Sequence, residues 1–233
     1  MTNKETTSSE PEPQECDTCR GFKFIRHAVE LGHPDFGKAF PCPVCVLGTQ
    51  KSVDWFAPLI EEHTKRGNMA AVQQAQRMAR QPSGWLVITG PVGTGKTALA
   101  SAILSHWAGK QRIPSTVASM LDRWRSVVTE DSFEAIFRLD ADASLAVLDD
   151  LGAEKVTDWT ADRMTQYLVW RAIQRQPTVI TTNHDADSLA RQFAERGNAT
   201  AGERIADRVF AVRSDLVRVV TLKGESFRTG RAW

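Results

Sequence analysis

A glycine-rich loop between an apolar strand and a helix is the feature that most restricts how this chain can fold. Residues 90–97 read Gly-Pro-Val-Gly-Thr-Gly-Lys-Thr, after the apolar run 85–89 and before the alanine-rich stretch 98–104. Glycine reaches the positive φ angles that turn successive backbone N–H groups inward, and the start of the next helix adds its positive dipole end. The complete G-x-x-x-x-G-K-T pattern in this context predicts a phosphate-binding loop (P-loop) in a parallel α/β sheet, rather than a chance glycine turn.

The loop residues have expected roles toward ATP. We expect Lys96 to bridge the β- and γ-phosphates and the Thr97 hydroxyl to ligate Mg²⁺. The predicted nucleotide-binding residues are Gly90, Pro91, Val92, Gly93, Thr94, Gly95, Lys96, Thr97 and Ala98 in the loop, with Asp149 from a later strand.

Length and composition set broad limits. The chain has 233 residues, 42% of them hydrophobic, and a formal net charge of +1. One α/β domain with a small appendage fits this length, and any nucleic-acid contact must come from local patches rather than from the overall charge. Because no apolar stretch approaches the ~20 residues that span a bilayer, and no apolar signal core opens the chain, we expect a cytoplasmic protein with no membrane partner.

The cysteines form two C-x-x-C pairs near the N-terminus. They are Cys16 with Cys19 and Cys42 with Cys45, separated by 22 residues. Two such pairs can supply the four thiolates of a tetrahedral Zn²⁺ site, and the closed shell suits holding a partner rather than catalysis. Two disulfides are the alternative, which a cytoplasmic compartment disfavours.

The chain divides into four expected segments. Residues 1–15 are a disordered leader, 16–50 a small zinc-ribbon-like module, 51–81 a linker and helix, and 82–233 the nucleotide-binding domain. In the linker, Trp55 and Phe56 are expected to pack, with adenine stacking as the alternative.

Two further predicted strands end in polar residues. The apolar stretch 144–148 leads into Asp149 and Asp150, and the stretch 177–182 leads into Asn183. Ligands of a parallel sheet bind beyond the carboxyl ends of its strands, so these side chains should lie beside the P-loop. We expect Asp149 to order Mg²⁺, Asp150 to polarise the attacking water and Asn183 to report the state of the nucleotide. The alternative for Asn183 is a cap on the following helix.

Together with the P-loop, the stretches 147–154, 177–183 and 202–210 give the chain a family resemblance. It resembles the AAA+ ATPases of the DnaC/IstB type, which are bacterial and phage loaders of the replicative helicase and related transposition helpers. The resemblance covers residues from about 82 to 228. It implies a five-stranded parallel P-loop sheet sandwiched by helices, a self-oligomer in a helical or ring assembly, and contacts with single-stranded DNA and a replicative helicase. The cysteine module resembles, more loosely, the zinc-binding domain with which some loaders hold the helicase.

AAA+ proteins complete each site with an arginine from the neighbouring subunit, which stabilises charge on the transferring phosphoryl group. The matching stretch offers Arg208, our first choice, and Arg204, one helical turn earlier. An ion pair with Glu203 or Asp207 is the alternative. Arg171 is a weaker candidate for an intersubunit contact.

Two departures from the family pattern alter what the resemblance implies. Many AAA+ proteins carry Glu where this chain has Asp150, so we expect slow ATP hydrolysis to ADP and phosphate. After Arg208 only a strand over 215–222 and a tail remain, so the helical lid is reduced or absent.

The resemblance places single-stranded DNA against the helices between the second and third strands. The mixture of cations and aromatics there suits such binding, although its aromatic members fit a core equally well, so none is assigned a site. The residues concerned are Arg123, Trp124, Arg125, Phe133, Phe137 and Arg138, with Lys155 as another DNA contact.

The sequence thus favours a helicase loader acting in DNA replication. A transposition helper that coats target DNA is the alternative. A zinc-dependent adaptor, in which nucleotide sets only the conformation, is a second alternative.

Overall fold

The computed structural model describes residues 24–25, 40–41, 54–107, 112–127, 129–195, 199–210 and 215–227. The chain forms two units, Met1–Val53 and Asp54–Trp233. In the first unit, strands β1 (Phe24–Ile25) and β2 (Phe40–Pro41) pair antiparallel. Cys16, Cys19, Cys42 and Cys45 lie outside the described residues, so the zinc module stays a prediction.

The second unit is built on a five-stranded sheet with the order β4-β5-β6-β3-β7. All neighbouring strands pair in parallel. The side chains of β3 and β6 are buried along their whole length, which explains why their sequences are continuously apolar or threonine-rich instead of alternating. The strand bounds are β3 Trp85–Thr89, β4 Arg112–Thr116, β5 Leu145–Leu151, β6 Thr178–Thr182 and β7 Val217–Thr221.

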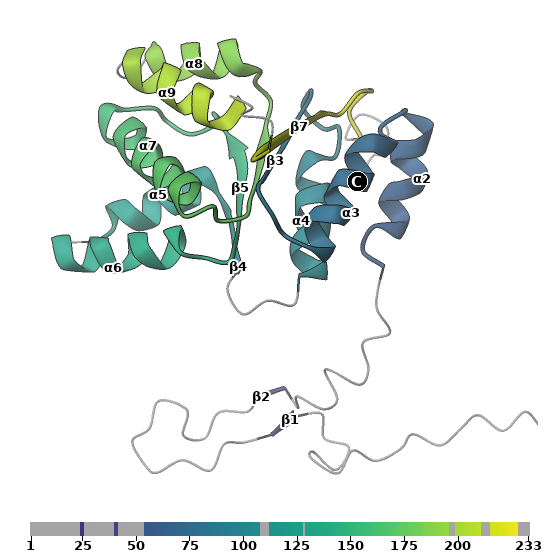
Figure 1. Ribbon diagram of the computed structural model, residues 1–233, viewed down its shortest axis with the longest axis horizontal. Coiled ribbons are helices and arrows are strands. Elements are labelled where there is room, and N and C mark those ends of the chain that lie inside the picture. Colours follow the sequence, from purple (N-terminus) through teal and green to yellow (C-terminus); the bar gives the residue numbers. More distant parts are fainter. Residues whose placement is uncertain are drawn as a thin grey trace, which may run out of the picture. The chain divides into compact units, whose positions relative to one another are not determined.

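Helices cover both faces of this sheet (Figure 1). One core lies between the sheet and α2–α4 and contains Leu86, Ile88, Leu99 and Ile103. The other lies under α5–α9 and contains Val87, Trp124, Tyr167 and Phe193. The helix bounds are α2 Ala57–Lys65, α3 Met69–Arg80, α4 Lys96–His106, α5 Val117–Arg125, α6 Glu130–Ala141, α7 Asp158–Ile173, α8 Ala186–Ala194 and α9 Ala199–Phe210. The α/β P-loop architecture expected from the sequence is confirmed.

The region before β3, where we expected a linker and one helix, contains the two helices α2 and α3. Val72 is buried in the core beside α4, because α3 presents an apolar face to the sheet, and Phe56, the N-cap of α2, packs into the same core. Trp55, by contrast, is 48% exposed.

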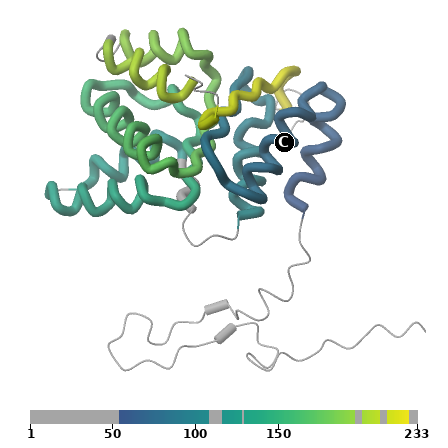
Figure 2. Tube along the Cα trace, viewed as in Figure 1, coloured from purple at the N-terminus to yellow at the C-terminus, as the bar shows by residue number. Residues whose placement is uncertain are grey.

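The C-terminal segment returns to the same side of the molecule as α2 and α3. Beyond β7, residues 222–227 run beside the α2–α3 connection (Figure 2). Within the described part of the chain, β7 is the last strand or helix. None of the described helices is long and apolar enough to cross a membrane.

Candidate nucleotide site

The P-loop connects β3 to α4 as predicted. Gly90, Gly93 and Gly95 have φ angles of 141°, 80° and 95°, which a residue with a β-carbon adopts only with strain. Lys96 starts α4 and is buried, with Nζ donating to the carbonyl oxygens of Gly90 and Pro91 at 2.8 Å each. The sole ammonium group of the loop therefore lies within its curve, where phosphate oxygens would be held.

Asp149 stands beside the first turn of α4. Its Oδ1 accepts hydrogen bonds from the hydroxyls of Thr97 (3.1 Å) and Thr181 (2.6 Å). A hydroxyl and a carboxylate are the hard oxygen ligands that Mg²⁺ prefers next to phosphates, so this pair fits the ion. When bound, Mg²⁺ would neutralise phosphate charge.

Asp150 is held in an unusual backbone conformation. Its φ is +62°, its N–H donates to Thr181 Oγ1 (2.8 Å), and its Oδ1 accepts from Asn183 Nδ2 (3.1 Å). A non-glycine residue with positive φ is uncommon and points to a local constraint. The Asp150 carboxylate thus contacts Asn183, whereas that of Asp149 contacts Thr97 and Thr181, consistent with different roles for the two acids.

Asn183 is not the cap of the following helix. The N-cap of α8 is Asp185, whose side chain accepts from the Ser188 N–H and forms a capping box. The amide of Asn183 instead contacts the Asp150 carboxylate. The geometry therefore favours the expected role of Asn183 as a sensor that reports the state of the nucleotide, over the role of a helix cap.

Two residues at this edge, Thr181 and Glu154, were missed by the sequence reasoning. Thr181 contacts both acids, and a threonine two residues before the sensor position on the adjacent strand was the available signal. Glu154, which is 5% exposed, accepts the Gly152 N–H at 2.8 Å. Burial and the nearby Asp150 charge raise the pKa of Glu154, whereas the backbone hydrogen bonds lower it.

Gly152 is also required by close packing. Its φ is +96°, and a β-carbon there would lie 2.6 Å from the His184 ring. The turn after the paired acids is thus fixed in two ways: by the close packing of Gly152 against His184 and by the hydrogen bond from Gly152 to Glu154.

Arg204 and Arg208 lie together on the exposed face of α9. Among the described residues, no ion pair joins either arginine to Glu203 or Asp207. Both guanidinium groups therefore remain accessible to a neighbouring molecule.

The expectation for Arg171 is wrong. Its side chain is fully buried and donates to the carbonyl oxygens of Ala141, Ala143 and Pro177 and to Thr178 Oγ1. An arginine that joins α7 to the ends of α6 and β6 has no surface to offer another subunit.

The aromatic residues between the second and third strands belong to the core, which was the alternative to a DNA contact. Trp124, Phe133 and Phe137 pack against one another and are at most 7% exposed. Arg123 pairs with Asp140, and Arg138 pairs with Glu134. Arg125 is exposed; its guanidinium lies 3.7 Å from the Asp122 carboxylate and 5.0 Å from the ring centroid of Trp159.

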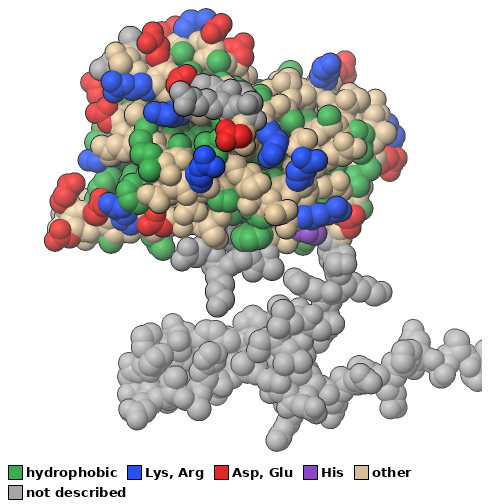
Figure 3. All heavy atoms as spheres, viewed as in Figure 1, with side chains coloured by type: hydrophobic (Ala, Val, Ile, Leu, Met, Phe, Trp, Pro, Cys, Tyr) green, Lys and Arg blue, Asp and Glu red, His purple; other side chains and the backbone are tan. Residues whose placement is uncertain are grey.

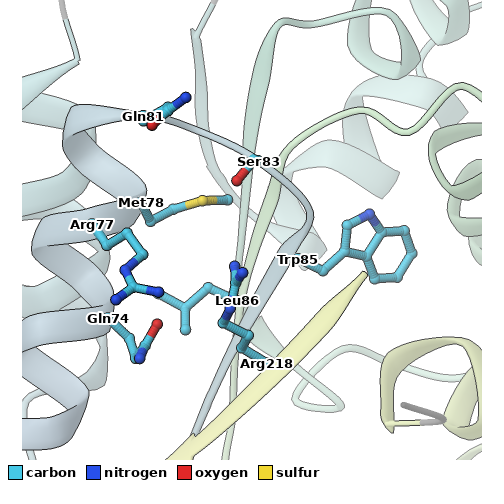
Figure 4. A pocket seen from close by; sticks show the side chains of 8 residues that line it. All are labelled: Gln74, Arg77, Met78, Gln81, Ser83, Trp85, Leu86 and Arg218. Carbon is cyan, nitrogen blue, oxygen red and sulfur yellow. The ribbon is translucent and has the colours of Figure 1, made fainter. Parts of the chain in front are cut away.

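A small pocket lies at the opposite end of β3 from the P-loop (Figure 4). Its volume is about 10 Å³, room for one water molecule. Arg77 of α3 and Arg218 of β7 line it, while the Trp85 indole points away from the other side chains. The described residues contain no cluster of three or more metal-binding side chains.

Comparison with known proteins agrees with this geometry. The chain has the fold of AAA+ P-loop ATPases. It belongs to the family of IstB-like ATP-binding proteins, whose profile matches residues 61–232. No curated protein matches it significantly in sequence.

Solved structures share the fold at low identity. The DnaC helicase loader is 20% identical, with a TM-score of 0.53; the match covers 66% of this chain and 89% of the DnaC chain. DnaI is 23% identical with a TM-score of 0.54, covering 67% and 85%. AMPPCP-bound DnaA from Aquifex aeolicus is 16% identical with a TM-score of 0.55, covering 67% and 46%.

Proposed function

We propose that this protein is an ATP-hydrolysing helicase loader of DNA replication that works as an oligomer. The observation that carries the proposal is the arrangement of Asp149 and Asp150 around Thr181, next to Lys96 and Thr97 of the P-loop. It supplies the groups that phosphoryl transfer needs: phosphate and metal ligands, and a separate carboxylate for the attacking water.

The residues divide the reaction as follows. The P-loop N–H groups and Lys96 bind the phosphates, and Thr97 with Asp149 holds Mg²⁺. Asp150 orients water for attack on the γ-phosphorus and accepts its proton, while the bond from that phosphorus to the bridging oxygen breaks and ADP leaves. Asn183 fixes the Asp150 carboxylate through their 3.1 Å hydrogen bond. Arg208 or Arg204 of a neighbouring subunit stabilises the charge that develops on the phosphoryl oxygens.

The partners are inferred from the related structures. One of them is a helicase loader by name, which supports a replicative helicase as the partner here. The replication initiator DnaA, another protein of similar fold, has been solved bound to AMPPCP and single-stranded DNA, which supports DNA as a ligand of the oligomer. The zinc module formed by Cys16, Cys19, Cys42 and Cys45 would hold the helicase. The protein would act in the cytoplasm. A transposition helper remains the alternative, and a transposase gene beside this one would favour it.

The test of the nucleotide switch compares wild type with Lys96→Ala, using Lys65→Ala as an exposed control. Lys96→Ala should lose ATP hydrolysis and ATP-dependent loading of the helicase onto single-stranded DNA, whereas the control should retain both. Loading by Lys96→Ala at the wild-type level would refute the proposal.

The zinc module is tested separately. The double variant Cys16→Ser, Cys19→Ser should lose bound zinc, measured by metal analysis, and should lose helicase binding. Full zinc content together with unchanged helicase binding would refute this part of the proposal.

A further inference from the structure

His63 is a buried side chain beside the P-loop whose chemistry the proposed mechanism does not use. It lies on α2 and is fully buried. Its Nε2 finds no hydrogen-bond partner among the described residues. A buried polar nitrogen without a partner costs free energy, so it suggests a ligand group that completes the bond.

The protonation of His63 follows from its neighbour. Asn68 Nδ2 lies 3.5 Å from His63 Nδ1, and the orientation of this amide is fixed by two bonds of 2.9 Å to the backbone of Lys223. Because Asn68 Nδ2 can only donate, Nδ1 must accept, and the proton of the neutral ring lies on Nε2. Burial and the charge of Arg66 lower the pKa of His63, while Glu62 opposes them, which favours this neutral form. The unpartnered atom is therefore a donor.

This donor meets the P-loop at Gly95. A β-carbon at position 95 would lie 3.2 Å from His63 Nε2 and 3.0 Å from the Phe227 ring. Gly95 is the residue before Lys96, so the imidazole lies within one residue of a predicted phosphate ligand. The imidazole belongs to α2, whereas Asp149 and Asp150 belong to β5.

The C-terminal segment closes the same place. The Phe227 N–H donates to the Gly93 carbonyl at 2.8 Å, and its ring stands at 88° to His63 with centroids 5.9 Å apart. The Arg66 guanidinium covers the Phe227 ring at 3.6 Å from its centroid and also donates to the Glu225 carbonyl. An aromatic ring, a cation and a hydrogen-bond donor thus converge beside the P-loop, a set that suits a flat heteroaromatic group.

We propose that His63 selects the base of the nucleotide, donating a hydrogen bond from Nε2 to a ring nitrogen of the purine, with Phe227 as the lid over that base. This inference rests on the proposed ATP binding and deepens it. The ring of Phe227 lifts from His63 when nucleotide enters and then covers the base, so that the segment 222–227 takes over part of the work of a helical lid.

The test measures dissociation constants by calorimetry for wild type, His63→Phe and the exposed control Lys65→Ala. His63→Phe keeps an aromatic ring against Gly95 and removes the donor. It should weaken ATP about tenfold, as expected for one lost hydrogen bond. Binding of tripolyphosphate, which has no base, should change less than about twofold, within the variation expected of sites that do not contact the ligand. Equal losses for ATP and tripolyphosphate, or no loss for ATP, would overturn the assignment.

Deaza analogues of ATP give a second measurement that needs no variant. Replacing the ring nitrogen at position 1, 3 or 7 by CH removes one acceptor at a time. One of the three analogues should bind wild type about tenfold more weakly than ATP, and His63→Phe should not distinguish that analogue from ATP. If all three bind wild type as ATP does, the hydrogen bond does not exist.

The lid is tested by Phe227→Ala in stopped-flow dissociation of ATP. Release should be about tenfold faster, since stacking on an aromatic ring contributes on the order of 1–3 kcal/mol per base. An unchanged rate would refute the lid. A wild-type protein that binds neither ATP nor tripolyphosphate would instead refute the proposed function itself.

Discussion

At the residue scale, one hydroxyl organises the predicted chemistry. Thr181 Oγ1 donates to the Asp149 carboxylate and accepts the Asp150 N–H. The side chain of one acid and the backbone of the other are therefore positioned by a single residue of the adjacent strand. This explains how two consecutive acids can face different partners, Thr97 for Asp149 and Asn183 for Asp150.

Asp150→Asn tests the assignment of the catalytic acid. The amide keeps the shape of the side chain but cannot accept a proton, so hydrolysis should fall about 10²- to 10⁴-fold. ATP binding should be retained, because the P-loop and Asp149 are unchanged. Phosphate release and nucleotide titration measure the two effects, with the exposed Asp187→Asn as the control. Hydrolysis within a few-fold of wild type would contradict the role.

Glu154 predicts a dependence of stability on pH. Its pKa is raised above the ordinary value of 4.5, so the folded state binds the proton more tightly than the unfolded chain does. The stabilisation that protonated Glu154 contributes to the free energy of unfolding is therefore fully present below pH 4.5 and is lost as the pH rises through the raised pKa. Glu154→Gln should therefore gain free energy of unfolding relative to wild type from pH 4.5 to 8, measured by urea titration. Parallel pH profiles for the two proteins would contradict this.

At the element scale, buried polar groups fix how the helices meet the sheet. Arg171 of α7 donates to the carbonyl groups of Ala141 at the end of α6 and of Ala143 before β5, at 2.9 Å each, and to that of Pro177 before β6. Tyr167, one turn earlier, donates to the Asp140 carbonyl, and burial raises its pKa to about 12. These bonds connect elements that would otherwise end with unpaired carbonyls.

Arg171→Met should therefore destabilise the fold. The substitution keeps an apolar stem but leaves several buried carbonyl groups unpaired, which should cost about 3 kcal/mol of unfolding free energy. Arg191→Met on the exposed face of α8 is the matched control and should change it by less than about 0.5 kcal/mol. Urea denaturation followed by circular dichroism measures both. A change for Arg171→Met as small as that of the control would show that water replaces the guanidinium.

At the scale of the whole molecule, the groups expected to act on ATP lie on two separate parts of the chain. One part is the sheet edge, where the P-loop, the paired acids and Asn183 lie together. The other is α9, where Arg204 and Arg208 are exposed and available to the site of a neighbouring subunit. Positive and negative side chains are interspersed over the face seen in Figure 3, consistent with the net charge of +1. Association would then depend on local contacts such as these arginines rather than on the overall charge.

Mixing two inactive variants tests whether the arginine acts between subunits. Lys96→Ala and Arg208→Ala should each abolish ATP hydrolysis alone. In an equal mixture, about a quarter of the sites combine an intact P-loop with an intact arginine from the neighbour, so activity should return to about that fraction. If Arg208→Ala alone retains hydrolysis, while Arg204→Ala is inactive alone and complements Lys96→Ala, the role moves to Arg204. A mixture of Lys96→Ala and Arg208→Ala that stays inactive would contradict action between subunits. Full activity of both arginine variants alone would refute an intersubunit finger.

Local signals explain why much of the site was predictable. The glycines, lysine and threonine of the P-loop lie within eight consecutive residues, so a short stretch of sequence specifies the conformation of the loop. Asp149, Asp150 and Asn183 follow apolar strands, and parallel strands bring such ends to one edge. Arg171 and Trp124 were misjudged or left open because helical exposure depends on which face packs inward. That face is set by neighbours far along the chain.

The sequence by itself determined the parallel α/β P-loop fold and the residues at its carboxyl edge, because both depend on local patterns of apolar runs, glycines and acids. Only the tertiary structure decided that Thr181 joins the two acids, that Arg171 is internal, and that His63 and Phe227 meet at Gly95. Apart from the bonds of Arg171 to Pro177 and Thr178, these contacts link positions from 28 residues apart, for Arg171 with Ala143, to opposite ends of the domain, for His63 with Phe227. The close packing of helices, sheet and C-terminal segment creates them, and short-range sequence patterns do not encode which distant side chains will share a buried space.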